Sequence, residues 1–275
     1  MKSVLKSLVL AVLGVCLTAG VFAQSEPPRD GVFTKKNVIE GEVTTYAPLR
    51  EADVMWAKRV WRIIDIREKI NLPFNYPKSR LIDVMMDAVL AGELTAYNPD
   101  SDDEFKVPMT PEEVGSIGRK TETTEVQDPT TGEFITETVT NDFNREEVIK
   151  YRVKEDWFFD RQRSVFECRI IGIAPVYNLR NSEGVFIGEK ALFWVYFDEA
   201  RNIFVNNEVF NRFNDAARMS YDDLFIKRMF NSYIIKQSNV YDRRIEDYKT
   251  GLDALYEAQA LEKELFEFEH DLWEY

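Results

Sequence analysis

The side chains that most often serve as nucleophile, general base or metal ligand are scarce in this sequence. His270 is the single histidine and lies five residues before the end of the 275-residue chain. Of the two cysteines, Cys16 sits inside an apolar leader, where it is poorly placed to carry a lipid, and Cys168 lies in a strand-like run. A histidine-activated nucleophile or a histidine-based metal cluster would depend on His270 alone. We therefore expect packing roles for His270 and Cys168.

Carboxylates are abundant, and two of them suffice to hydrolyse a glycosidic bond. Glu155, Asp156 and Asp160 surround three consecutive aromatic residues and are generic candidates for such a pair. An exported enzyme acting on envelope glycans through paired carboxylates is therefore one alternative for the function.

Two common ligand-binding loops have no match in the sequence. The acidic turn from Asp100 to Glu104 resembles the start of a calcium loop, but Phe105 and Pro111 stand where an EF-hand needs glycine and glutamate. The 12 glycines are scattered singly, so no glycine-rich loop is available to hold a phosphate group. We expect no catalytic residue, no metal and no cofactor.

The first 23 residues have the form of a secretory signal. Lys2 and Lys6 precede an apolar run from Leu8 to Phe22, and small side chains precede the bond between Ala23 and Gln24. We predict cleavage after Ala23. Nothing else approaches the roughly 18 apolar residues that span a bilayer, so we expect an exported mature chain without a transmembrane segment.

The chain is acidic, with 48 acidic and 35 basic residues and a formal net charge of −13. Nucleic acids and anionic lipid surfaces call for basic patches, so neither is an expected partner. With one cysteine after the leader, folding must rest on a hydrophobic core rather than on disulfides. The expected partners are proteins or neutral molecules.

The strongest helical pattern lies between Tyr46 and Pro77. Trp56, Val60 and Ile63 recur at spacings of four and three, which predicts an amphipathic helix. We expect this helix to form a hairpin with a second one between Ser79 and Gly92.

The tryptophans and arginines of this helix have two interpretations. They pack in the core with a solvated charged flank, or they bind another protein, because Trp and Arg are enriched at interface hot spots. In the second case, charge reversal at Arg59 and Arg62 should weaken co-isolation of partners and leave the thermal melt unchanged. The residues proposed for a partner interface are Trp56, Arg59, Trp61, Arg62, Trp157, Phe158 and Trp273.

The remaining patterns predict an α+β fold with a small antiparallel sheet flanked by amphipathic helices. Strand-like runs at 165–176 and 191–197 form an antiparallel pair, and capping boxes at Thr110 and Ser220 begin helices. A long helix runs from Thr250 toward the C-terminus and docks on its own domain or on another chain. Threonine-rich segments on either side of a glycine turn predict an exposed hairpin between 119 and 141.

The expected domain organisation follows from these patterns. Residues 1–23 form the signal peptide and 24–45 a flexible lead-in without clear periodicity. Residues 46–275 form a single α+β domain with an exposed excursion at 98–144.

Several of these stretches, in this order and spacing, resemble the GldN/PorN family, components of the type IX secretion and gliding motility machinery of Bacteroidetes. The resemblance rests on residues 53–62 with 67–69, 154–160, 192–197, 233–236 with 239–241, and 269–273.

The resemblance implies a non-enzymatic periplasmic subunit at the periplasmic face of the outer membrane. Such a subunit forms a large ring with an outer-membrane lipoprotein, GldK/PorK, and meets the periplasmic region of the motor protein GldM/PorM. The family brings no catalytic residues to carry over. The alternatives are the glycan-cleaving enzyme above and a periplasmic chaperone for secreted cargo.

Overall fold

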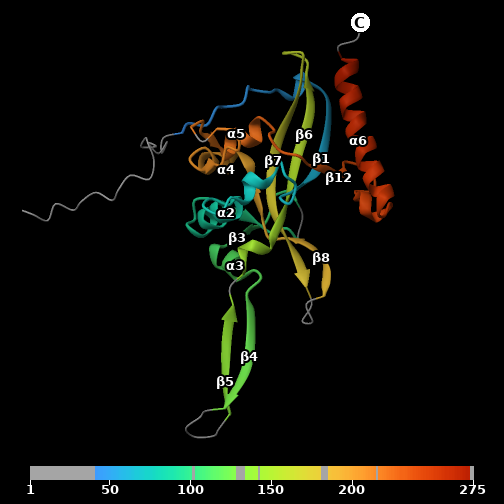
Figure 1. The fold of residues 1–275 in the computed structure, drawn as a ribbon. Helices are drawn as coiled ribbons and strands as arrows, with labels where there is room; N and C mark the ends of the chain where they lie inside the picture. Colours follow the sequence, from blue (N-terminus) through green and yellow to red (C-terminus); the bar gives the residue numbers. More distant parts are fainter. Residues whose placement is uncertain are drawn as a thin grey trace, which may run out of the picture. The chain divides into compact units, whose positions relative to one another are not determined.

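The computed structural model describes residues 41–100, 103–127, 134–141, 143–180, 185–214 and 216–272, within one compact unit, Ile39–Tyr275. An eight-stranded antiparallel sheet has the order β12-β1-β6-β7-β9-β2-β3, and β8 also pairs with β7 (Figure 1). The strands are β1 (Val54–Asp65), β2 (Ala96–Tyr97), β3 (Pro108–Met109), β4 (Lys120–Gln127), β5 (Phe134–Asn141), β6 (Val148–Asp160), β7 (Val165–Arg180), β8 (Phe186–Ala191), β9 (Trp194–Tyr196), β10 (Glu208–Val209), β11 (Met219–Ser220) and β12 (Tyr233–Gln237). The helices are α2 (Leu81–Leu90), α3 (Pro111–Ser116), α4 (Phe197–Phe204), α5 (Tyr221–Ile226) and α6 (Leu252–Asp271).

The segment with the strongest helical pattern is the strand β1. It pairs with β6 along its whole length and with β12 on its other side. The predicted helix between Tyr46 and Pro77, and with it the helical hairpin, is therefore wrong. A strand that is paired on both sides and covered on both faces has little surface exposed to solvent. Every residue of β1 from Val60 to Asp65 is accordingly buried.

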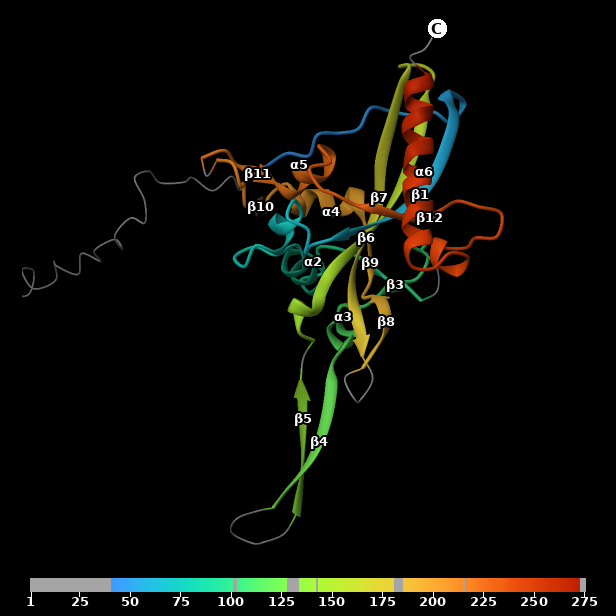
Figure 2. The same ribbon diagram turned by 45° about the vertical axis from the view of Figure 1, so that its right-hand side comes forward.

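The helices cover one face of the twisted sheet. Val60 and Ile64 are an even number of residues apart on β1, so their side chains point to the same face. Ile64 belongs to the main core cluster, with residues of α2, α4 and α5, whereas Val60 packs against Ala258 and Leu265 of α6. Figures 1 and 2 both show α6 alongside β1.

The opposite face carries a smaller apolar cluster. Trp61 and Ile63 of β1 meet Trp194 of β9 and Ile235 of β12 there. Phe105, from the loop between β2 and β3, packs edge-on against Trp194 with ring centroids 6.2 Å apart. This loop takes the place of a helical layer on that face.

Local signals in the sequence are confirmed. Thr110 caps α3 and Ser220 caps α5, and each side chain accepts a hydrogen bond from the backbone three residues on. α6 begins at Leu252, although Gly251, with a φ of 58°, precedes it without a side-chain cap. The α+β class, the hairpin of β4 and β5 within 98–144, and the long C-terminal helix are confirmed.

The sheet is larger than the small one predicted, because β1 adds a long strand in place of a helix. The predicted strand pair exists, with β7 pairing to β8 and β9. The apolar run at 191–197 is divided, since β9 ends at Tyr196 and Phe197 begins α4. The predicted cleavage point between Ala23 and Gln24, residues 24–40 of the lead-in and Trp273 lie outside the described residues.

Candidate functional site

Trp56 and Trp157 lie on the helix-covered face of the sheet, close to α6. The Trp56 ring stacks on Phe268 of α6 with centroids 4.3 Å apart. Phe166 of β7 lies 5.5 Å from Trp56 and 5.4 Å from Trp157. Rings at these separations attract one another beyond the area they bury. Trp56 and Trp157, both proposed for a partner interface, thus help to form the surface on which the chain's own last helix packs.

Arg62 also joins the sheet to α6. Its guanidinium donates to the hydroxyl of Ser232 at 2.8 Å and to the Ser232 carbonyl at 3.1 Å, and it pairs with the carboxylate of Glu262 in α6. Only 5% of Arg62 is exposed. A buried arginine whose donors are satisfied within the chain has a structural role.

Arg59, Trp61 and Phe158 lie on the opposite face. Trp61 and Phe158 are buried, and the guanidinium of Arg169 lies 5.2 Å from the Phe158 ring. Arg59 donates two hydrogen bonds to Asp156, at 2.6 and 2.8 Å, and its side chain is 42% exposed. The described residues proposed for a partner interface are therefore divided between two faces, and their role in binding stays a prediction.

Glu155 has no exposed surface and forms the centre of a charged cluster beside α6. Arg228 donates to its carboxylate at 2.9 Å, and the indole N–H of Trp157 donates at 3.1 Å. The Cys168 thiol lies 3.5 Å from the same carboxylate. Burial, and next the Glu155 charge, raise the pKa of the Cys168 thiol well above its ordinary value. The thiol therefore stays protonated and is not an activated nucleophile.

The carboxylates considered for glycan cleavage do not form a pair. Glu155 and Asp156 are consecutive residues of β6, so they point to opposite faces of the sheet. Asp160 accepts hydrogen bonds from the backbone of Gln162 and from the side chain of Arg163 in the turn after β6. Glu155 and Asp156 therefore do not face a common space, as a glycosidase acid and its partner must.

The outward side of α6 is open to solvent. Ala258 and Leu265 are the buried residues of this helix, whereas Tyr256 and Phe266 are 60% and 66% exposed. Large exposed apolar side chains beside charged ones are typical of protein-binding surfaces.

The described part of the chain offers neither a metal cluster nor a membrane-spanning helix. Among the residues that the structure describes, no group of three His, Cys, Asp or Glu side chains could hold a metal ion. No helix there combines the length and apolar character needed to cross a membrane.

Comparison with known families identifies the family of this chain. The model of a family described as "Gliding motility associated protein GldN" matches residues 49–274. The chain belongs to the GldN family. No curated protein matches it. Membership makes the protein a component of the gliding motility and type IX secretion machinery, in a family that is structural and not known for enzymes.

The matched range of this GldN family member contains two ion pairs, each with one buried partner, that sequence reasoning missed. Glu155 and Arg228 are 73 residues apart, and Arg62 and Glu262 are 200 residues apart. No local pattern marks such partners, because each pair forms only when the complete sheet brings α6 and the loop after α5 onto β1 and β6.

Proposed function

We propose that this protein is a non-enzymatic periplasmic structural subunit of the type IX secretion and gliding machinery. In this proposal it associates with itself and with an outer-membrane lipoprotein of the GldK/PorK type in a large ring, and it contacts the periplasmic region of GldM/PorM. The observation that carries the proposal is the family match, whose range, 49–274, contains every described helix and strand.

Two further features support the proposal. The signal-like leader, with expected cleavage between Ala23 and Gln24, favours export to the periplasm. The exposed apolar side chains Tyr256 and Phe266 on α6 favour contacts with other proteins.

Affinity isolation of the tagged protein from gently solubilised envelopes, followed by sedimentation sizing and mass spectrometry, tests the proposal. We expect a particle many times the mass of one 32.1 kDa chain that contains a lipoprotein. A protein that remains a monomer after crosslinking in intact cells would contradict it. N-terminal sequencing of the isolated protein, expected to begin at Gln24, tests the export step separately.

A further inference from the structure

A cleft of about 380 Å³ lies beside β12, between this strand and the first half of α6. Three consecutive residues of β12, Tyr233, Ile234 and Ile235, line it. Consecutive side chains of a strand point to opposite faces, so a cleft that touches all three runs along the edge of the strand rather than over one face. Its other walls are formed by Ile245, Glu246, Lys249, Thr250, Gly251, Ala254, Leu255 and Ala258.

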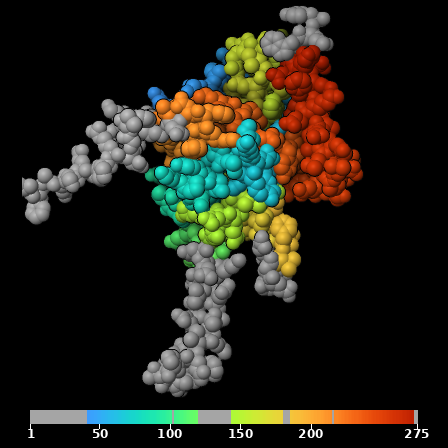
Figure 3. Space-filling view, viewed as in Figure 1, coloured from blue at the N-terminus to red at the C-terminus, as the bar shows by residue number. Residues whose placement is uncertain are grey.

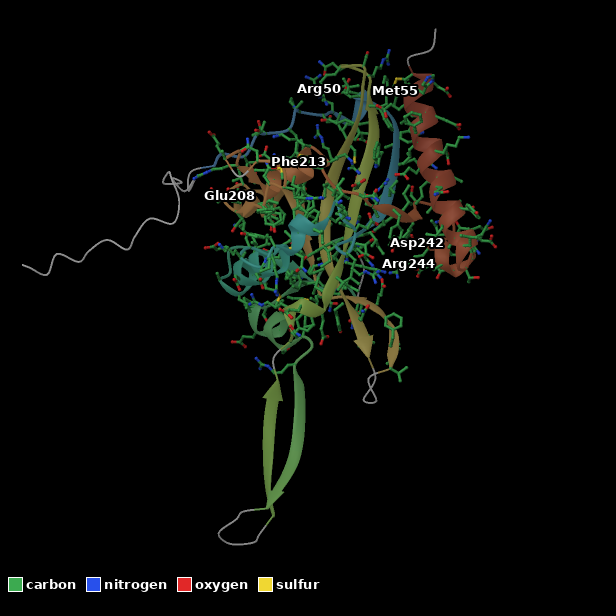
Figure 4. The ribbon with its side chains drawn as sticks, viewed as in Figure 1. Arg50, Met55, Glu208, Phe213, Asp242 and Arg244 are labelled. Carbon is green, nitrogen blue, oxygen red and sulfur yellow. The ribbon has the colours of Figure 1, made fainter. Side chains whose placement is uncertain are left out.

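This edge of β12 has no partner strand in the part of the chain that the structure describes, where β12 pairs with β1 alone. The loop after β12, marked by Asp242 and Arg244 in Figure 4, is tied to the end of the strand by an ion pair of 2.6 Å between Lys236 and Asp242. An edge strand beside a helix is the arrangement in which an extended segment adds to a sheet: the backbone groups pair and alternate side chains enter the groove.

A second free edge lies on β8, on the far side of the sheet. Phe186 and Ile187 at its start are 54% and 61% exposed. Among the described strands β8 pairs only with β7, and β7 residues beyond Tyr177 have no partner on β6. Figure 3 shows β8 in yellow at the surface, apart from α6 in red. A run of exposed apolar residues on an edge strand is a liability unless another chain covers it.

We propose that β8 of one copy adds to β12 of a second copy, with Phe186 and its neighbours against the cleft. This inference rests on the proposed function, in which the subunit associates with itself. β8 does not pair with β12 of its own chain, because β1, β6 and β7 lie between them in the sheet.

The two edges also match in charge. The segment from Val185 to Gly188 carries no charge, and the two charged residues of the cleft, Glu246 and Lys249, are opposite in sign. A neutral apolar strand therefore meets a neutral apolar cleft. Because the two surfaces differ and lie at different ends of the sheet, their contact is heterologous: each copy offers one edge and receives another, so the contact can repeat around a closed ring.

Disulfide trapping in intact cells tests which residues meet. A chain carrying both Phe186→Cys and Leu255→Cys should give a ladder of linked multimers after mild oxidation, and each single variant should give none. Cys168 does not interfere, because it is partly buried in contact with Glu155 and Arg228, and its thiol stays protonated. Multimers from either single variant, or no ladder from the double variant, would overturn the inference. If the ladder is absent while a large lipoprotein-containing particle is still isolated, the edge pairing is wrong and the proposed function stands; if the particle is absent too, both are wrong.

Purified mature chains give an independent test by sedimentation velocity. Phe186→Asp places a charge on the apolar surface of β8, and Leu255→Asp places one in the cleft. Both positions are exposed, so the fold should tolerate each change. Each variant alone should associate at least about tenfold more weakly than the unaltered chain. Their equimolar mixture should form a dimer and nothing larger, since one intact β8 meets one intact cleft. Met55→Asp, at a 65% exposed position of β1 away from both edges, is the control and should match the unaltered chain. Equal sedimentation of all the chains would refute the pairing.

Discussion

The ring of Trp56 is stacked on that of Phe268, with centroids 4.3 Å and planes 18° apart, so the first long strand holds the last helix. Besides this stack, Ala258 and Leu265, the buried residues of α6, pack against Val60, and Glu262 pairs with Arg62. The attachment of α6 therefore depends on a small number of side chains that single substitutions can remove.

Phe268→Ala should loosen α6 without unfolding the sheet. The change removes a half-buried ring and its aromatic contacts with Trp56 and Phe166, which together contribute about 1–3 kcal/mol. Hydrogen exchange measured by mass spectrometry should show faster exchange across residues 252–271 and unchanged protection in β6 and β7. Phe266→Ala, two residues away and 66% exposed, is the control and should leave exchange unaltered. Equal exchange in the two variants would mean that the stack does not hold the helix.

Arg62→Glu should lower the stability of the whole domain. It places a negative charge in a site that is 5% exposed, beside Glu262, and leaves Ser232 without its donor. The expected loss in unfolding free energy is about 3 kcal/mol or more. The structure thus changes the expectation from the sequence that charge reversal here leaves the thermal melt intact.

Arg59→Glu is the matched comparison for Arg62→Glu. The Arg59 side chain is 42% exposed, so loss of its pair with Asp156 should cost about 1 kcal/mol or less. Urea denaturation followed by circular dichroism separates the two variants. Similar stability for both would show that burial of Arg62 does not matter. Any effect of Arg59→Glu on co-isolation of partners would then report on binding rather than on folding.

Removal of the Arg228 side chain should lower the free energy of unfolding by more than its partial exposure suggests. Its side chain is 31% exposed, but its partner Glu155 is fully buried, so Arg228→Met leaves a carboxylate without a counter-charge. We expect a loss of about 2–4 kcal/mol for Arg228→Met. The double variant with Glu155→Gln should recover about 1 kcal/mol or more of the summed single effects, because the unpaired charge is then absent. Strict additivity in a denaturation cycle would show that the two groups are not coupled.

The sequence misled most clearly at β1. Trp56, Val60 and Ile64 are four residues apart, and this spacing suits one face of a helix as well as one face of a strand, because four is close to 3.6 and is also even. In the sequence, Ile63 continues the helical stripe and Trp61 widens it, whereas in the strand both side chains point to the opposite face. Pairing with β6 and β12, which are distant in sequence, is what makes this segment extended.

The sequence was sufficient to predict those elements whose formation depends on residues close together in the chain. The capping boxes at Thr110 and Ser220 begin helices in the structure, because each depends on residues three positions apart. The residues proposed for an interface were chosen by type, and type does not reveal burial: Trp61 and Arg62 are adjacent, both buried, and point to opposite faces. The edge of β12 required the complete strand order to be known.

Acid should weaken the fold partly through Asp65. Its side chain is 12% exposed and accepts hydrogen bonds from the backbone and the side chain of Arg67, both at 2.9 Å. The hydrogen bond from the Arg67 side chain is the largest effect, and it lowers the pKa of Asp65 below its ordinary value of 3.8. Burial opposes this shift, and the hydrogen bond from the Arg67 backbone adds to it. The unfolded chain therefore binds a proton more readily than the folded one. The resulting stabilisation is fully present above the unfolded pKa and is lost as the pH falls through the lowered, folded pKa.

Comparison with Asp65→Asn isolates this contribution. The Arg67 side chain is 65% exposed, so solvent screening limits the pair to about 1 kcal/mol. The difference in unfolding free energy between the unaltered chain and Asp65→Asn should be constant above about pH 5 and should shrink below the ordinary carboxyl pKa. Glu51→Gln, which removes one negative charge at an exposed position, controls for net charge. A difference that stays the same in urea melts at pH values above and below this range would show that the ionised form of Asp65 does not stabilise the fold.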